Sequence, residues 1–439
     1  MSVLQKYQNK NIAIYGLGVT GISAAKVLKS LKAKIFCWDD NYNIRKKAKN
    51  INLNISKFWL NKNSIDNIVI SPGIDINKCK IKKFLKKNSK KIITDLDLFF
   101  ELNKKALIIS ITGTNGKSTT CKIIEKILKT GGHDAITVGN IGNPILSFRK
   151  SKKNTFFILE VSSYQLQYSK LFRSKHAAIL NISPDHLERH KNIFNYTKIK
   201  SKIFFAQKNK DYSYINSSNN YSRVIKNIFK TKKLKSKLIS VNGESCKFLL
   251  KKINNNYFKS KGNIENLAFA YKIIKKFKIK DKIVIKALSK FKGLSHRQEL
   301  IFKNDKFVCI NDSKATSFDA SLQSLSNYKK IYWIVGGLPK RKDRFFLKDV
   351  SKNILKAYVI GKKTNFFVKK IKNYIPFKKS YNIKTAISDI LKDNRQTRNI
   401  QFTILLSPAA ASYDQFKNFE DRGNYFKKIA KKMLVKFNA

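Results

Sequence analysis

The stretch ISITGTNGKSTTCKII, residues 109–124, has the pattern of a phosphate-binding loop between a β-strand and an α-helix. An apolar run over 106–111 enters a turn with two glycines, Gly113 and Gly116. The segment that follows has apolar side chains at helical spacing, at Ile123, Ile124, Ile127 and Leu128. Backbone N–H groups at such a helix start bind phosphate oxygens, while Lys117 would reach the β- and γ-phosphates and Ser118 would bind Mg²⁺. The stretch therefore predicts a nucleotide site in an α/β fold.

The loop is shorter than the usual G-x-x-x-x-G-K-[ST] pattern, because Gly113 lies only three residues before Gly116. Three kinds of chemistry use a loop of this kind. They are hydrolysis that drives motion, phosphorylation of a stable acceptor, and activation of a carboxylate for bond formation. The loop by itself does not choose among them.

Length and composition predict an intracellular protein of several domains. The chain has 439 residues, which corresponds to two to four domains, and 42% of them are hydrophobic, enough for several cores. The N-terminus enters a strand-like segment instead of a signal-peptide core, and no run of about 18 apolar residues suggests a membrane span. Five scattered cysteines contain no C-x-x-C pair. We expect a cytoplasmic protein with reduced thiols and no membrane association.

The formal net charge of +65 invites a nucleic-acid interpretation, but its distribution favours another explanation. The excess is mostly lysine, and it accompanies asparagine and isoleucine along the whole chain, as an AT-rich coding bias would produce. A dedicated binder would concentrate arginine and aromatic side chains on one element. We therefore expect no dedicated nucleic-acid partner, although the protein should bind RNA nonspecifically at low salt.

Three blocks of alternating strand-like and helix-like segments predict parallel sheets with helical crossovers. The strand-like segments of the three blocks are 10–18, 33–40 and 66–74; 106–111, 155–163 and 176–184; and 307–312, 330–337, 356–361 and 401–408. A polar stretch over about 208–262 predicts only weak short strands, and a helix is expected over 263–277. The lysine runs are interpreted as solvated faces.

A second glycine motif, G-x-G-x-x-G, follows the first predicted strand at Gly16, Gly18 and Gly21. Asp39 ends the next strand, where an acid would meet a ribose hydroxyl. The motif requires only a diphosphate near a helix N-terminus, so nicotinamide binding, a UDP-type diphosphate and a purely structural turn all remain open. A simple dehydrogenase would not need the second phosphate loop that follows about a hundred residues later. The UDP-type ligand is therefore favoured.

Seven ordered stretches resemble the Mur ligase family, which builds the peptide stem of peptidoglycan. They are GTNGKST (113–119), GNIG (139–142), LEVSSYQL (159–166), NISPDHLERH (181–190), GLSHRQE (293–299), NDSKATS (311–317) and SPAAASYDQFKNFEDRG (407–423). The resemblance covers essentially the whole chain. It implies a three-domain α/β architecture, with a Rossmann-like N-terminal domain over 1–93, a central P-loop domain over 94–298 and a Rossmann-like C-terminal domain over 299–439. Ligands divided between domains imply domain closure.

The last two stretches, together with SPG at 71–73, resemble the family members that add D-glutamate to UDP-N-acetylmuramoyl-L-alanine. Such ligases transfer the ATP γ-phosphate to a carboxylate, and an amine then attacks the acyl phosphate. A sister ligase or a folylpolyglutamate synthase is the alternative within the same class, because the phosphate loop is common to all of them. A catalytically idle, RNA-associated protein is the alternative from another class. The resemblance also implies a monomer.

The resemblance implies ATP and two Mg²⁺ ions as cofactors. The implied ATP ligands are Gly113, Thr114, Asn115, Gly116, Lys117, Ser118, Thr119, Asn263, Asn266, Arg297 and Asp312. The implied metal ligands are Ser118, Glu160, His186 and Lys200, and the implied catalytic residues are Lys117, Glu160, His186, Lys200 and Arg297. Mg²⁺ takes oxygen ligands and one or two carboxylates, which suits Glu160 at a strand end. The guanidinium of Arg297 could hold the γ-phosphate with a planar fork.

The remaining implied residues bind the two substrates. For the nucleotide sugar they are Gly18, Thr20, Asp39, Ser71 and Gly73, and Asn140 and Ser162 face the transferring phosphate. For D-glutamate they are Lys314, Thr316, Lys340, Ser412 and Phe419. A substrate with two carboxylates needs cations and hydroxyl donors, and these positions supply both.

The chain departs from the family pattern at three places. Gly262 and Asn263 replace the usual His-Asn, so Asn263 is a weaker candidate for adenine than Asn266. Asp40 and Asn41 stand where a hydroxyl residue and an arginine are more frequent, which puts the uracil contact in doubt. Arg341 and Lys342 directly follow Lys340 and could take its place.

One lysine is expected to be chemically modified. Lys200 lies four residues after Tyr196, on a predicted helix about ten residues beyond the Asp185-His186 motif. This matches the family position where a lysine reacts with CO₂ to form a carbamate, an anionic oxygen ligand in a segment poor in acids. An unmodified surface lysine is the alternative, and Lys198 and Lys202 lie nearby as unmodified comparisons.

Overall fold

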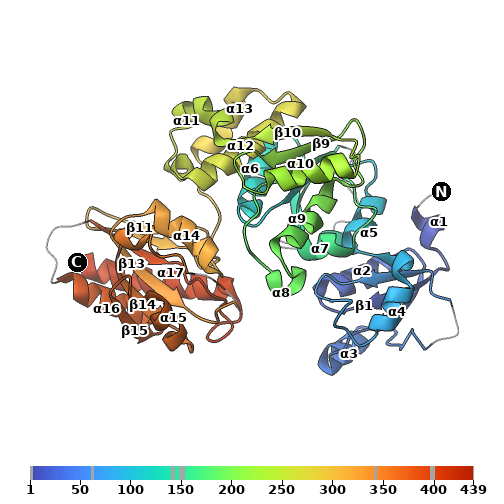
Figure 1. Ribbon diagram of the computed structural model, residues 1–439, viewed down its shortest axis with the longest axis horizontal. Coiled ribbons are helices and arrows are strands. Elements are labelled where there is room, and N and C mark those ends of the chain that lie inside the picture. The colour runs from blue at the N-terminus through green and yellow to red at the C-terminus, as the bar shows by residue number, and fades with distance from the viewer. Residues whose placement is uncertain are drawn as a thin grey trace. The chain divides into compact units, whose positions relative to one another are not determined.

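The computed structural model describes residues 3–60, 64–139, 144–147, 154–340, 343, 345–395 and 401–438. The chain forms two compact units, Met1–Lys290 and Phe291–Ala439 (Figure 1). The first unit contains two β-sheets and the second contains one. The boundaries expected near 93 and 298 stay predictions. In the described ranges no helix is long and apolar enough to cross a membrane.

The first sheet has four parallel strands in the order β2-β1-β3-β4. Its strands are β1 (Asn11–Tyr15), β2 (Lys34–Trp38), β3 (Asn67–Ile70) and β4 (Ile92–Ile93), and its helices are α1 (Val3–Tyr7), α2 (Val19–Ser30), α3 (Tyr42–Lys49) and α4 (Lys82–Lys87). β1 and β3 are almost entirely buried, as expected for strands covered on both faces. The strand β1 therefore delivers the first glycine motif to the carboxyl edge of this sheet.

The second sheet has six parallel strands in the order β10-β9-β8-β5-β7-β6. The strands are β5 (Leu107–Thr112), β6 (Ala135–Gly139), β7 (Phe156–Glu160), β8 (His176–Ile179), β9 (Tyr212–Asn216) and β10 (Lys237–Val241). The helices are α5 (Asp95–Leu102), α6 (Lys117–Thr130), α7 (Ser163–Tyr168), α8 (Leu187–His190), α9 (Ile193–Ser201), α10 (Ser222–Thr231), α11 (Lys247–Ile253), α12 (Lys261–Ile274) and α13 (Asp281–Ser289). The phosphate-loop strand β5 is central, so its loop lies between the ends of β7 and β8.

The second unit contains a mixed six-stranded sheet in the order β11-β12-β16-β13-β14-β15. Its strands are β11 (Glu299–Lys303), β12 (Phe307–Asn311), β13 (Ile331–Gly336), β14 (Ile354–Ile360), β15 (Phe377–Tyr381) and β16 (Phe402–Leu406). Its helices are α14 (Phe318–Asn327), α15 (Thr364–Ile371), α16 (Ile383–Arg395) and α17 (Phe419–Asn438). One face packs against α14 and α15 and the other against α16 and α17. Two cores therefore bury the sheet on both sides.

The expected α/β class and strands are confirmed, and two features differ from expectation. The polar stretch over 208–262 contains the helices α10 and α11 as well as the edge strand β10 and its neighbour β9. The apolar residues of α10 point inward at helical spacing, and its lysines face solvent. The strand β11 pairs antiparallel with β12, so this sheet is not purely parallel. All five cysteines carry free thiols.

Candidate active site

The phosphate loop connects β5 to α6, and its shape depends on one glycine. Gly116 has φ 83°, in the left-handed region that favours glycine. A β-carbon at Gly116 would lie 2.2 Å from Oδ1 of Asn266 on α12. Asn266 is buried, and its Oδ1 also accepts a hydrogen bond from the Thr120 hydroxyl at 3.2 Å. The predicted adenine residue Asn266 thus packs directly under the loop.

We predict that Gly116→Ala destabilises the protein by about 2 kcal/mol, because it combines positive-φ strain with a steric clash. Gly132→Ala is the matched control. Gly132 has φ 81°, but a β-carbon there would have no atom within 4 Å. Chemical denaturation of both variants measures the difference. Equal losses of unfolding free energy would show that the Asn266 contact does not constrain the loop.

Asn181 and Ser183, which follow β8, hold the phosphate loop from one side. The side-chain oxygen of Asn181 accepts a hydrogen bond from the N–H of Asn115 at 2.8 Å, and its carbonyl accepts from the N–H of Thr114 at 3.0 Å. The N–H of Ser183 donates to the Thr114 hydroxyl oxygen at 3.0 Å. These contacts fix the loop backbone before any ligand arrives. Asn181 and Ser183 were not among the predicted site residues, although both belong to the NISPDHLERH stretch.

The side chain of Lys117 folds back over the phosphate loop that precedes it. Its ammonium donates to the carbonyl oxygens of Gly113 at 2.9 Å and Thr114 at 2.8 Å. This position brings a positive charge to the N-terminus of α6, where the backbone N–H groups and the helix dipole also favour anions. Thr119 lies buried in the first turn of the same helix.

The structure brings Ser118 and Glu160 together. Glu160 ends β7 opposite Ile111 of β5, and its Oε2 accepts a hydrogen bond from the Ser118 hydroxyl at 2.5 Å. Both side chains are buried. A hydroxyl oxygen and a carboxylate oxygen side by side next to a phosphate loop are the donor types that Mg²⁺ prefers. These residues therefore fit one of the two expected ions.

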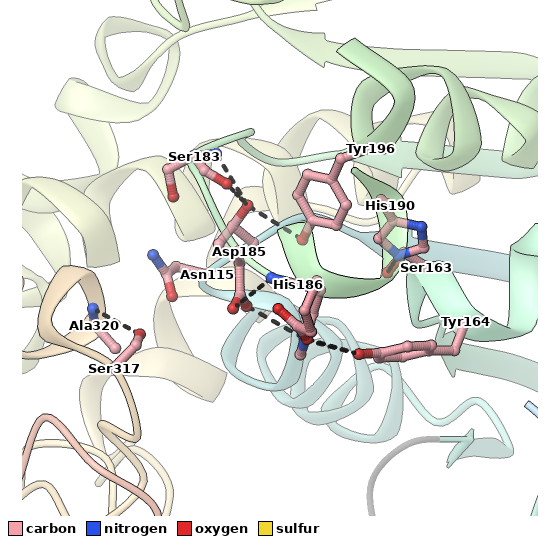
Figure 2. Close-up of polar contacts among 12 residues, drawn as sticks. Asn115, Ser163, Tyr164, Ser183, Asp185, His186, His190, Tyr196, Ser317 and Ala320 are labelled. Carbon is pink, nitrogen blue, oxygen red and sulfur yellow. Dashed lines mark hydrogen bonds and ion pairs between the residues drawn. The ribbon is translucent and has the colours of Figure 1, made fainter. Parts of the chain in front are cut away.

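Tyr164 and Asp185 are two of the polar neighbours that surround His186 (Figure 2). The Tyr164 hydroxyl lies 3.0 Å from His186 Nδ1, and a carboxylate oxygen of Asp185 lies 3.3 Å from Nε2. Burial raises the pKa of Tyr164 to about 12, so its hydroxyl stays protonated at neutral pH. Partners on the second ring nitrogen commonly orient a metal-binding histidine. Neither Tyr164 nor Asp185 was among the predicted site residues.

Lys200 is buried beside the phosphate loop, so it is not a surface lysine. It is 1% exposed, and its ammonium donates to the carbonyl of Gly113 at 2.9 Å and the hydroxyl of Thr112 at 3.2 Å. Burial lowers the pKa of Lys200 well below its usual range, and the nearby charge of Lys117 lowers it further. Lys198 is exposed, whereas Lys202 is partly buried and donates to the carbonyl of Gln167 at 2.6 Å. Lys198 is therefore the better comparison.

The described residues contain no group of three histidine, cysteine, aspartate or glutamate side chains placed to hold a metal ion together. Glu160 and His186 instead lie on either side of the phosphate loop. Mg²⁺ usually retains water and binds substrate phosphates in addition to one or two carboxylates, so such a divided site is compatible with it.

Ser162 begins α7 as its N-cap and accepts a hydrogen bond from the N–H of Gln165 at 3.3 Å. The side-chain amide of Gln165 in turn donates to buried Asp95 at 3.0 Å. Asn140, expected beside Ser162, lies outside the described residues. Asn263 lies one turn before Asn266 on α12, and its amide donates to the carbonyl of Tyr257 at 2.8 Å.

The first glycine motif forms a tight turn after β1. A β-carbon at Gly21 would lie 1.9 Å from the carbonyl oxygen of Gly16, and Ser71 donates to that same oxygen at 2.6 Å. Asp39 accepts hydrogen bonds from the N–H groups of Leu17 at 2.8 Å and Asn41 at 2.9 Å. Asp39 therefore shapes the turn itself, a role that sequence analysis did not assign.

Three of the other predicted nucleotide-sugar residues lie around this turn. Gly18 is exposed at the N-terminus of α2, and Thr20 is partly exposed one residue inside it. Gly73 lies two residues after Ser71 on the loop that follows β3, and it is exposed. The carboxyl ends of β1, β2 and β3 thus gather the five positions at one edge of the sheet.

In the second unit, Asp312 follows β12 and is tightly held. Its carboxylate accepts hydrogen bonds from Ser324 at 2.5 Å, Ser407 at 3.1 Å and the N–H of Gln298 at 3.2 Å. Burial raises the pKa of Asp312 to about 6. Arg297 precedes Gln298 in a partly exposed turn that a backbone bridge to Leu294 closes.

Four of the five predicted D-glutamate residues lie in loops that follow β12, β13 and β16. Lys314 places its ammonium 3.6 Å from the centre of the Phe419 ring. Thr316 is partly exposed and Ser412 is buried. Lys340 lies in the loop after β13, where its carbonyl accepts a hydrogen bond from Asp343 at 3.2 Å. Arg341 and Lys342 lie outside the described residues.

Arg422 is a buried cation in the SPAAASYDQFKNFEDRG stretch, and it was not among the predicted site residues. It donates to the hydroxyl of Ser313 at 3.0 Å, the carbonyl of Ser313 at 2.8 Å and the carbonyl of Ala410 at 3.0 Å. Burial lowers the pKa of Arg422 to about 10. Arg422 joins the loop that carries Lys314 to the loop that carries Ser412. An arginine surviving in such a lysine-rich chain was the signal that could have found it.

Comparisons with known proteins agree with this geometry. Residues 10–93 match the model "Mur ligase MurD-like, N-terminal domain", and residues 111–285 match "Mur ligase middle domain". A UDP-N-acetylmuramoylalanine--D-glutamate ligase of Rickettsia felis is 36% identical over 98% of both chains, and one of Caulobacter sp. is 32% identical over 97% of both. The chain belongs to the Mur ligase family.

Solved structures show the same fold at low sequence identity. A MurF ligase from Thermotoga maritima, in complex with ADP, has a TM-score of 0.54 and 13% identity, covering 98% of this chain and 97% of its own. An E. coli FolC in complex with DHPP and ADP has a TM-score of 0.57 and 12% identity, covering 77% of this chain and 92% of its own. These likenesses concern the fold alone.

Proposed function

We propose that this chain is the ligase that adds D-glutamate to UDP-N-acetylmuramoyl-L-alanine, using ATP and releasing ADP and phosphate. The observation that carries the proposal is the full-length similarity to relatives named for that reaction, at 36% identity. The phosphate loop with its Ser118–Glu160 pair supports the use of ATP. The reaction makes a precursor of peptidoglycan in the cytoplasm, and a monomer is the proposed active species.

The chemistry divides into two steps. A carboxylate oxygen of UDP-N-acetylmuramoyl-L-alanine attacks the γ-phosphorus of ATP, and the bond to the bridging oxygen of ADP breaks. The D-glutamate amine then attacks the acyl carbon of the mixed anhydride, loses a proton, and inorganic phosphate leaves. Negative charge accumulates in both steps. Fixed cations and backbone N–H groups that meet this charge lower the barriers.

The phosphate loop supplies the first group of such donors. The N–H groups at the start of α6 and the Lys117 ammonium would meet the β- and γ-phosphates, and Arg297 is proposed to bind the γ-phosphate as well. Bound Mg²⁺ would neutralise phosphate charge, with Ser118 and Glu160 holding one ion and His186 and Lys200 the other. Asn266 and Asn263 contact adenine, and Asp312 contacts the ribose.

Lys200 is proposed to act as its carbamate. Its buried position favours the neutral amine, which attacks CO₂ with loss of one proton to give an anionic carbamate. The carbamate would supply an anionic oxygen ligand on α9, a helix that contains no aspartate or glutamate. Lys200 lies within hydrogen-bond distance of the Gly113 carbonyl, so the new oxygens would lie beside the transferring phosphate.

The substrates are assigned to the two ends of the chain. The turn after β1, with Gly18, Thr20, Asp39, Ser71 and Gly73, holds the UDP diphosphate and sugar, and Asn140 and Ser162 face the acyl phosphate. In the second unit, Lys314, Lys340 and Thr316 meet the carboxylates of D-glutamate, with Ser412 and Phe419 completing the pocket. The ring of Phe419 holds the Lys314 ammonium in place.

We predict that D-glutamate supports ATP-dependent phosphate release with UDP-N-acetylmuramoyl-L-alanine, whereas L-glutamate, meso-diaminopimelate and L-alanine do not. Several fixed contacts to one small substrate give this stereochemical selectivity. Lys314→Ala and Ser412→Ala should raise the KM for D-glutamate by about 10-fold or more while changing that for ATP little. Equal turnover with L-glutamate would reject the assignment. Turnover with glutamate on a folate substrate would favour the folylpolyglutamate synthase alternative.

A further inference from the structure

Arg189 joins two functional loops that belong to different sheets of the first unit. It lies on α8, three residues after His186, and its side chain is 8% exposed. One guanidinium nitrogen donates to the carbonyl of Gly73 at 3.4 Å, and another donates to the carbonyl of Ile74. Its Nε donates to the side chain of Gln167 on the segment after β7 at 2.8 Å. All three guanidinium nitrogens of Arg189 thus donate a hydrogen bond.

Aromatic rings complete the attachment. The guanidinium carbon of Arg189 lies 5.4 Å from the ring centre of Tyr164 and 5.9 Å from that of Tyr168. The Tyr168 hydroxyl accepts a hydrogen bond from the N–H of Ile76 at 3.1 Å. The carboxylate of Asp75 lies 4.0 Å from Nε of Arg189. The loop over 71–76 therefore rests on α7 and α8 through one arginine and one tyrosine.

The two ends of this attachment reach groups with proposed roles. On one side, Ser71 begins the loop and hydrogen-bonds the carbonyl of Gly16 in the first glycine turn. On the other side, Tyr164 beneath the guanidinium hydrogen-bonds the ring of His186 (Figure 2). A continuous series of contacts thus runs from the nucleotide-sugar turn to the histidine beside the phosphate loop.

We infer that Arg189 is a positioning residue that sets the nucleotide-sugar loop, 71–76, relative to the His186 segment. This inference rests on the proposed function for the identity of the substrate. In the reaction, the substrate carboxylate must be positioned relative to the γ-phosphate to within about 0.5 Å. The nucleotide end of the same substrate is held on the other sheet. Lysine cannot replace Arg189, because a single ammonium does not present a planar fork to separate acceptors.

The test compares Arg189→Ala and Arg189→Lys with the wild-type protein. Both should raise the KM for UDP-N-acetylmuramoyl-L-alanine about 10-fold and lower kcat, with the KM for ATP within about twofold, because the phosphate loop keeps its own contacts. Added guanidinium ion should restore part of the rate of Arg189→Ala and none of that of Arg189→Lys. A merely structural role would not produce this split or this rescue.

Hydrogen exchange in the ligand-free protein gives a second readout. Backbone amides in 73–76 and in 185–191 should exchange faster in both variants. Arg173→Ala is the matched control, since Arg173 pairs with Asp211 at 2.7 and 3.0 Å in the same unit, away from both loops. The control should change neither these amides nor the KM for the nucleotide sugar.

The outcomes separate this inference from the proposed function. Unchanged exchange at both loops would overturn the inference, and so would faster exchange with an unchanged KM, since Arg189 would then only stabilise the fold. A wild-type protein that does not ligate D-glutamate would overturn the proposed function. In that event, calorimetric binding of the nucleotide sugar to wild type and to Arg189→Lys replaces the KM comparison, and equal affinities would overturn the inference.

Discussion

Lys200→Ala is expected to lower kcat by about 100-fold or more, the size of effect seen when a group that stabilises transition-state charge is removed. The reason is the burial of Lys200 against the phosphate loop, where its carbamate is proposed to hold a metal ion beside the transferring phosphate. The rate of ATP-dependent phosphate release measures the loss. Acetate or formate should restore part of the rate, because a small carboxylate can enter the vacated space.

Lys198→Ala is the control for this variant, because Lys198 is exposed on the same helix. It should retain near-wild-type kcat. Thermal unfolding of both variants shows whether the fold is intact. A Lys200→Ala enzyme with undiminished kcat would eliminate the carbamate and the assignment of a metal ion to this side of the loop. Mass spectrometry of the wild-type protein in bicarbonate buffer gives an independent readout of the carbamate.

Glu160→Gln is expected to lower kcat by about 100-fold and to raise the Mg²⁺ concentration needed for half-maximal rate. The substitution keeps the volume of the side chain but removes the negative charge of the carboxylate that accepts a hydrogen bond from Ser118 at the phosphate loop. A titration of phosphate release against Mg²⁺ measures both effects. Manganese binding followed by electron paramagnetic resonance, with a nonhydrolysable ATP analogue, reports the metal site without turnover.

Glu125→Gln provides a second largely buried glutamate for comparison. Glu125 lies on α6 and bonds Lys122, Lys129 and Thr137, away from the phosphate loop. Its replacement should cost some stability but leave the Mg²⁺ dependence unchanged. If Glu160→Gln and Glu125→Gln show the same Mg²⁺ dependence as wild type, Glu160 is not a metal ligand.

Much of the fold was predictable from local sequence. Strands such as β1, β5 and β13 are short apolar runs with glycines at or just after their ends, and their pattern depends only on neighbours in the chain. The helix α10 was not predicted, because the stretch that contains it is rich in lysine and other polar residues, and that composition predicts only weak short strands. The apolar side chains of α10 nevertheless lie at helical spacing on one face. The antiparallel strand β11 depends on pairing with β12, which local pattern does not specify.

By itself, the sequence determined the α/β class, the position of both glycine turns and the family, because motif order and spacing are properties of the chain. Tertiary structure alone decided which side chains meet. It placed Tyr164 against His186, Arg189 between two sheets and Arg422 between two loops. It also showed that Lys200 is buried while Lys198 is exposed. Burial and contact between residues far apart in sequence arise from packing of the whole chain, so the local sequence around one residue does not specify them.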